Sequence, residues 1–296
     1  MVSDFVLEPR GPFDLASAAR FIAGWPPAAR PDAAAGNQRV VRLGFLVDDW
    51  SGHAGVVLSQ ARPDDPVEIT LTSSTAADPE RVRDQAARVV SLDHDGRGYA
   101  ELAERDEVVG RRARESGWLC PVLFHSPYEA ACWAVMSARI RQSQAAQVRD
   151  ELAAAHGVEL DVDGEVLPGF PAPERLLAVE TVQGLSEEKV LRLHGVAGAA
   201  LEGRLDRGRL LAAAPEAALG ALQEIRGIGP FWATGILLRA VGTTDVLTLA
   251  EQRVRAAAAE AYEAPEVTDD DEAFLALAER WRPFRTWVAV LLRATS

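Results

Sequence analysis

Short apolar stretches separated by turn residues dominate the first 115 positions. Four of them are rich in β-branched side chains and are bounded by glycine, proline or aspartate, as β-strands commonly are: Phe5–Leu7, Arg39–Asp48, Gly55–Leu58 and Val67–Thr72. Asp78-Pro79-Glu80 has the capping aspartate and first-turn proline of a helix, and apolar residues then recur at helical spacing. The pattern predicts a mixed N-terminal domain, residues 1–115, built on a β-sheet.

From about Trp118 the apolar positions recur at helical spacing, between short glycine or proline breaks. Ser126-Pro127-Tyr128-Glu129 is a capped helix start, and no breaker follows from Ala130 to His156, so one continuous helix is expected there. Three further helices are predicted, over Pro173–Val179, Ser186–Gly195 and Pro215–Gln223. We therefore expect an α+β protein in which residues 116–296 form a nearly all-helical domain.

Two glycines separate two apolar helical stripes within residues 218–240. Gly227 and Gly229 permit an unusual turn around Ile228, and Ala233 continues the stripe on the second helix. This is a helix–hairpin–helix pattern, in which bare backbone N–H groups around Gly229 can bind a DNA phosphate without reading base sequence. An ordinary corner between two helices is the alternative, since two glycines would serve there too.

Composition limits the classes of protein to which the chain can belong. The 296 residues suffice for about two domains, and no apolar run reaches the roughly 18 residues of a membrane-spanning helix. The first residues carry Asp4 instead of positive charge and lead into no apolar stretch, so we expect a cytoplasmic protein. Cys120 and Cys132 are the only cysteines, which excludes a disulfide framework and a four-cysteine iron–sulfur site; we expect buried thiols.

The net charge of −13 taken alone argues against a polyanionic partner such as DNA. The distribution of charge over the surface can overturn this argument. Basic residues gathered on one face would still attract phosphates while the acidic residues lie elsewhere.

Several segments carry a specific family resemblance. Together with the hairpin they are PFD at Pro12–Asp14, SPYEAACWAVMSARI at Ser126–Ile140, FPAPERLLAVE at Phe170–Glu180 and WRPFRTWVAVLLR at Trp281–Arg293. In order and spacing they resemble the helix–hairpin–helix DNA glycosylases, and within them the DNA-3-methyladenine glycosylase II family, over most of the chain. The resemblance implies a bacterial, nucleoid-associated monomer that binds double-stranded DNA, flips out a damaged, alkylated base and hydrolyses its N-glycosidic bond in base-excision repair.

The family's catalytic aspartate follows the hairpin. Counted without gaps, its place is taken by Glu251, which keeps the carboxylate but adds a methylene. Such a carboxylate stabilises the positive charge that builds on the sugar and orients a water molecule. The alternative is a surface glutamate that pairs with Arg255 at i+4.

The base pocket departs further from the family pattern. The aromatic residue after the hairpin is Phe231, the second aromatic place holds Gly235, and the place on the closing helix holds Arg293. An arginine is unfavourable beside a cationic base. Trp232, one place from Phe231, is a pocket candidate that we assign to the core.

On the same resemblance, Arg139 stands where the family has the side chain that fills the gap left by the flipped nucleotide, and Arg141 follows it. Arg226, Arg239 and Arg253 add positive charge close to the hairpin in sequence. Arg139, Arg141, Arg226 and Arg253 are predicted DNA contacts; for Arg139 and Arg141 the alternatives are simple phosphate contacts or solvated charges.

Glycosylases that also cut the strand use a lysine just after the hairpin glycines, a place that Phe231 fills here, and the chain's one lysine is Lys189. We therefore expect a monofunctional enzyme without a catalytic metal or cofactor, with at most a structural monovalent cation held by hairpin carbonyls. Two other interpretations stay open: a non-catalytic DNA-binding or lesion-sensing relative, and a helical protein with no role on DNA.

Overall fold

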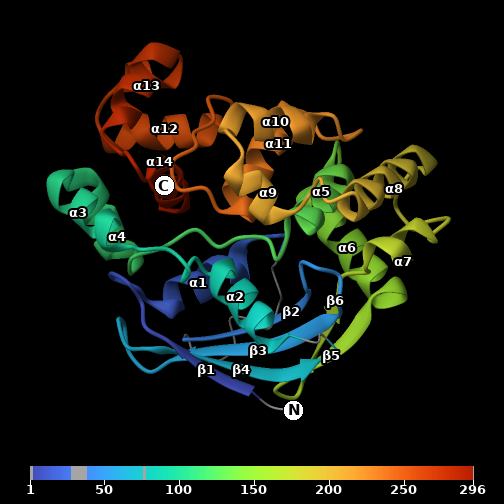
Figure 1. The fold of residues 1–296 in the computed structure, drawn as a ribbon. Helices are drawn as coiled ribbons and strands as arrows, with labels where there is room; N and C mark the ends of the chain where they lie inside the picture. Colours follow the sequence, from blue (N-terminus) through green and yellow to red (C-terminus); the bar gives the residue numbers. More distant parts are fainter. Residues whose placement is uncertain (1–2, 28–38, 76–77, 296) are drawn as a thin grey trace.

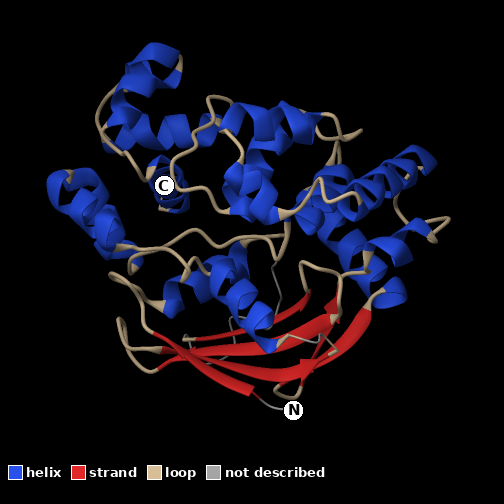
Figure 2. Ribbon diagram, viewed as in Figure 1, coloured by secondary structure: helices blue, strands red, loops and turns tan. Residues whose placement is uncertain are grey.

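The computed structural model describes residues 3–27, 39–75 and 78–295. An antiparallel sheet in the order β1-β4-β3-β2 forms the base of the molecule in Figures 1 and 2, with helices α1 (Leu15–Gly24) and α2 (Pro79–Val89) packed on it. Its strands are β1 (Ser3–Leu7), β2 (Val40–Leu46), β3 (His53–Gln60) and β4 (Val67–Ser74). The four predicted strands and the helix after Asp78 are confirmed, as is the α+β fold class.

One feature of the C-terminal part was not predicted. Strands β5 (Val158–Val162) and β6 (Glu165–Gly169) form a hairpin, so the expectation of a nearly all-helical segment after residue 116 is wrong there. The hairpin packs on strands β2 and β3 of the sheet, where the close approach requires glycine: a Cβ at Gly44 would lie 2.9 Å from the Leu167 Cβ. Leu160, Val162 and Leu167 are buried against the sheet. This burial stabilises the two segments as paired strands.

The single helix expected over Ala130–His156 is also wrong. The chain forms α5 (Pro127–Ser137) and α6 (Gln142–His156), separated by a turn in which Arg139 adopts a φ of 59°. That left-handed conformation is incompatible with a continuing helix. The break lets α5 remain buried on nearly all sides while α6 leaves along the surface.

Helices form most of the remaining structure (Figure 2). They are α3 (Arg97–Arg105), α4 (Glu107–Ser116), α7 (Pro173–Leu177), α8 (Glu187–Leu201), α9 (Arg207–Ala212), α10 (Pro215–Gln223), α11 (Pro230–Ile236), the π-helical turn η1 (Leu237–Val241), α12 (Gln252–Ala261), the 3-10 turn η2 (Pro265–Thr268), α13 (Asp271–Glu279) and α14 (Arg285–Ala294). The predicted helices at Pro173 and Pro215 are confirmed, and the one predicted over Ser186–Gly195 continues to Leu201.

Two large clusters of buried side chains lie between these layers. One joins residues 13–122 to residues 254–292, and the other gathers Leu46 with residues 124–241. Helices α12 to α14 therefore share a core with the N-terminal sheet. The division at residues 115 and 116 remains a proposal, and any N-terminal unit would rest on the C-terminal helices.

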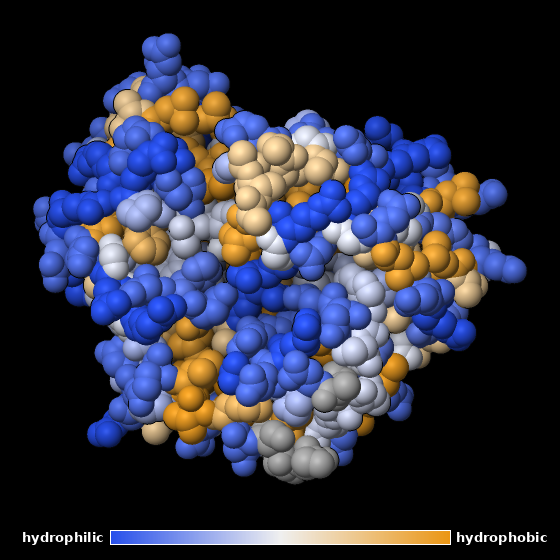
Figure 3. All heavy atoms as spheres, viewed as in Figure 1, coloured by the Kyte–Doolittle hydropathy of each residue, from blue (hydrophilic) through white to orange (hydrophobic). Residues whose placement is uncertain are grey.

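The face of the molecule shown in Figure 3 is mostly hydrophilic, with hydrophobic areas that are separated from one another. Within the described ranges, every helix is too short or too polar to cross a membrane. Cys120 and Cys132 are buried thiols as predicted, and burial raises the pKa of Cys120 to about 12.

Candidate active site and nucleic-acid interface

A cavity of about 850 Å³ lies beside the hairpin. Its wall is built by residues of α1 and the segment after it, α5, α6, α11, η1, α12, α14, the loop that leads into α12, and Phe124. Seven residues singled out from the sequence line it: Phe231, Trp232, Gly235, Arg239, Glu251, Arg253 and Arg293. Positions spread over more than sixty residues of sequence thus meet in one hollow, and their roles there remain predictions.

Glu251 occupies the N-cap position of α12, at the positive end of the helix dipole. Its side chain does not cap the helix and is 20% exposed. One carboxylate oxygen lies 4.0 Å from an Nη atom of Arg293 on α14, and no hydrogen bond joins the carboxylate to any described residue. The carboxylate is therefore sheltered and available to a bound molecule.

The alternative partner for Glu251 is contradicted. Arg255 is buried, donates from Nε to the Val267 carbonyl oxygen over 3.0 Å and pairs with Asp271. Glu251 and Arg255 are four residues apart but lie in different environments. Glu251, at the start of α12, borders the cavity, whereas Arg255 points towards η2 and α13. The i+4 pairing with Glu251 predicted as an alternative is therefore wrong.

Two aromatic residues flank the cavity at the start of α11. Phe231 is 50% exposed and meets Trp232 edge to face, with ring centroids 5.6 Å apart. Trp232 packs on the hydrophobic core and also lines the cavity, so its assignment to the core is correct only in part. A Cβ at Gly235 would lie 3.3 Å from the Trp232 ring, so this ring fills the space in which a side chain at position 235 would begin.

Arg239 is a wall residue whose surroundings the sequence did not reveal. It comes from η1 and donates from Nε and Nη2 to the Val122 carbonyl oxygen over 3.1 and 2.7 Å. Its guanidinium lies over the rings of Trp25 (4.4 Å) and Phe21 (5.0 Å) from α1. Because these aromatic residues lie more than 200 positions earlier in the chain, no local pattern signals the contact.

The hairpin between α10 and α11 has the geometry expected of its glycines. Gly227 has a φ of 101°, and a Cβ there would lie 3.3 Å from a methyl group of Val135. Ile228 is buried and anchors the turn. Gly229 is the N-cap of α11, where a Cβ would meet nothing within 4 Å, and its N–H makes no hydrogen bond within the described residues. The turn thus presents a bare, unpaired backbone donor.

The predicted DNA-contacting arginines lie on exposed turns and helix ends. Arg139 and Arg141 lie in the turn between α5 and α6, next to Gln142, which lines the cavity. Arg226 is 73% exposed in the hairpin and lies 3.7 Å from Glu188. Arg253 is exposed on α12 at the cavity rim. These cations border the hairpin and cavity, and their contacts with DNA remain a prediction.

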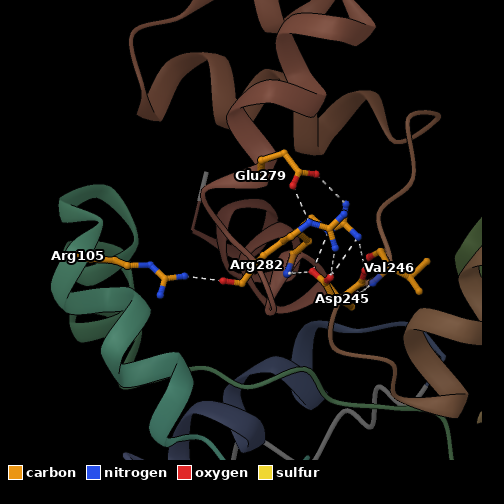
Figure 4. Close-up of polar contacts among 7 residues, drawn as sticks. Arg105, Asp245, Val246, Glu279 and Arg282 are labelled. Carbon is orange, nitrogen blue, oxygen red and sulfur yellow. Dashed lines mark hydrogen bonds and ion pairs between the residues drawn. The ribbon is translucent and has the colours of Figure 1, made fainter.

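A polar cluster fixes the loop that carries Glu251 (Figure 4). Asp245 accepts from Arg285 Nε over 2.8 Å and from Arg282 Nη1 over 2.6 Å. Arg285 also donates to the Asp245 carbonyl oxygen over 2.7 Å, and Thr286 donates to Val246 over the same distance. The start of α14 therefore holds the beginning of the loop, while Arg293 near the end of α14 approaches Glu251.

The cavity wall does not include the lysine that strand-cutting chemistry would need. Lys189 is on α8, donates from Nζ to the Met136 carbonyl oxygen over 2.8 Å and does not line the cavity. Among the described residues, no cluster of histidine, cysteine, aspartate and glutamate has the arrangement of a metal site. A monovalent cation held by hairpin carbonyls remains a prediction.

No family model matches the chain. The DNA-3-methyladenine glycosylase of Bacillus subtilis (strain 168) is 27% identical over 152 residues, which is 50% of this chain; the match spans about half the length of that relative. The solved 3-methyladenine DNA glycosylase from Archaeoglobus fulgidus superposes with a TM-score of 0.74 at 19% identity, covering 99% of this chain and 97% of that chain.

Two further solved structures share the architecture. The 8-oxoguanine glycosylase/lyase of Clostridium acetobutylicum in complex with double-stranded DNA has a TM-score of 0.58 at 15% identity, over 82% of this chain and 83% of that one. The DNA-3-methyladenine glycosidase of Bacillus halodurans has a TM-score of 0.51 at 20% identity, over 65% and 86%. The chain has the fold of the helix–hairpin–helix DNA glycosylases, and its predicted resemblance to the DNA-3-methyladenine glycosylases among them is confirmed.

Proposed function

We propose that this protein is a monofunctional DNA glycosylase of base-excision repair, which hydrolyses the N-glycosidic bond of a damaged base flipped out of duplex DNA. The observation that carries the proposal is the Glu251 carboxylate, held at a helix N-terminus in the wall of a cavity next to a bare hairpin. The fold and the partial match to a DNA-3-methyladenine glycosylase support it.

The hairpin binds one phosphate of the duplex through the backbone around Gly229, which fixes the DNA without selecting a sequence. Arg139 fills the gap left in the base stack, and Arg141, Arg226 and Arg253 contact neighbouring phosphates. The flipped base enters the cavity beside Phe231 and Trp232.

Glu251 acts on the sugar. As the bond to the base breaks, positive charge builds on the sugar ring, and a carboxylate in a sheltered site stabilises that charge. The same carboxylate orients a water molecule, which adds to the anomeric carbon and leaves an abasic site. Because the only lysine lies outside the cavity, no amine forms a Schiff base, and the strand is left intact.

The test uses duplex DNA that contains alkylated, deaminated or oxidised bases in separate samples. After incubation, heating in alkali converts abasic sites to strand breaks. We expect breaks with the wild type, a loss of at least about 100-fold in Glu251→Gln because the charge is removed, and retained cleavage in Glu251→Asp.

Duplex binding measured in parallel separates this proposal from its competitor. A wild type that binds every damaged duplex and releases no base would be a lesion-binding relative of the family without catalysis. Cleavage by Glu251→Gln at the wild-type rate would assign the catalytic charge to another group.

A further inference from the structure

Positive charge predominates in the cavity wall. Among the described residues of the wall there are four arginines and two glutamates: Arg20, Arg239, Arg253 and Arg293 against Glu251 and Glu260. Of these cations, Arg293 lies 4.0 Å from Glu251, so one carboxylate is already opposed by a guanidinium. A bound base meets a wall in which cations outnumber anions.

Two of the aromatic rings in the wall are also engaged by a protein cation. Arg239 lies over Trp25 and Phe21 at 4.4 and 5.0 Å, and its hydrogen bonds to Val122 hold it there. The negative faces of both rings are thus turned to a guanidinium. Burial, with a further contribution from the charge of Arg293, lowers the pKa of Arg239. Each positive charge added to the cavity increases the electrostatic repulsion that Arg239 experiences.

Arg239 keeps donors for a ligand. Its hydrogen bonds within the described residues use Nε and Nη2, both to one carbonyl oxygen, and leave the two N–H groups of Nη1 unused. A guanidinium in a sheltered site favours an acceptor oxygen, above all one that gains negative charge.

We infer that the cavity takes a neutral damaged base that carries ring carbonyl oxygens, as deaminated and oxidised bases do, in preference to a cationic N-alkylated base. The inference rests on the proposed glycosylase function and names its substrate class. An alkylated purine brings positive charge to a wall that is already cationic, whereas a carbonyl oxygen finds donors on Arg239.

The same arrangement fits the bond-breaking step for such a base. When the sugar–base bond breaks, its electron pair leaves with the base, which becomes an anion, and the sugar becomes a cation. The guanidinium groups stabilise the anion and Glu251 stabilises the cation. Water then adds to the sugar, and the proton that the water loses neutralises the departing base. An alkylated base leaves as a neutral molecule and gains nothing from the guanidinium groups.

Single-turnover release from four matched duplexes tests the inference. They contain hypoxanthine, 8-oxoguanine, 7-methylguanine and 3-methyladenine, the last two cationic. Release of hypoxanthine or 8-oxoguanine at least 10-fold faster than either alkylated base supports the inference. Faster release of an alkylated base overturns it and leaves the proposed glycosylase intact. Binding to all four duplexes without release from any overturns both.

A charge variant tests the cause. In Arg293→Gln one positive charge leaves the wall, so we expect the rate ratio of neutral to alkylated bases to fall about 10-fold. Arg209→Gln, an exposed arginine on α9 outside the cavity, is the matched control and should keep the wild-type ratio. An Arg293→Gln enzyme that is folded and active but has the wild-type ratio contradicts the role assigned to the guanidinium.

Discussion

Gly227 is the hairpin residue whose backbone excludes an ordinary side chain. Its φ is 101°, and a Cβ at this position would lie 3.2 Å from the Arg192 side chain, so alanine is disfavoured on both counts. We expect Gly227→Ala to lower the free energy of unfolding by about 1–2 kcal/mol and to weaken duplex binding. Gly229→Ala is the control, because its φ of −86° and open surroundings accept a methyl group. Chemical denaturation measures the free energy of unfolding of both variants. Equal losses of stability in the two would refute a conformational role for Gly227.

The place of Glu251 could be predicted from residue order, since a carboxylate was expected at a fixed distance after the hairpin. The arginine that lies beside its carboxylate could not be predicted in this way. The i+4 rule indicated Arg255, but tertiary packing directs Arg255 to Asp271 and brings Arg293 from α14 to Glu251. Arg239 was missed as a wall residue for the same reason: what an arginine does in a cavity depends on rings supplied by a distant helix.

Among the helices and strands, the α+β order and the boundaries of α10 followed from proline, glycine and apolar spacing. The β5–β6 hairpin had a local signal that the prediction overlooked. Asp163-Gly164 is a strong turn pair, with φ values of 58° and 81°, and the alternating Leu160, Val162 and Leu167 face the sheet. The break at Arg139 had no such signal, because neither glycine nor proline marks it.

The loop between η1 and α12 depends on the Asp245 cluster for its position (Figure 4). In Asp245→Asn, Arg285 and Arg282 lose their ion pairs with residue 245 and keep only those with Glu279. We expect the free energy of unfolding to fall by about 1–3 kcal/mol and base release to slow by about 10-fold, with duplex binding unchanged. Glu279→Gln, which changes a side chain that is itself 55% exposed, is the comparison and should change little. Wild-type release by Asp245→Asn would show that the loop keeps its position without this cluster.

In the molecule as assembled, the cavity needs both ends of the chain. Phe21 comes from α1 and Trp25 from its C-cap, while Glu251, the N-cap of α12, and Arg293 of α14 come from beyond residue 250. The shared core of residues 13–122 and 254–292 holds these walls together. A cut at residue 115 would therefore expose apolar surface and open the cavity, which explains why a boundary drawn from composition does not mark an independent site.

The net charge of −13 makes the response of DNA binding to salt a decisive measurement. If the hairpin side of the molecule contacts phosphates, the logarithm of the binding constant falls linearly with the logarithm of salt concentration, by about 0.9 per phosphate contact. Arg141→Ala should reduce this slope by about one contact and weaken binding at low salt. Arg62→Ala, an exposed arginine between β3 and β4, removes the same charge away from the hairpin and should leave the slope unchanged. A flat dependence for the wild type would instead indicate a protein without a role on DNA, since a polyanion cannot be held without displacing its counterions.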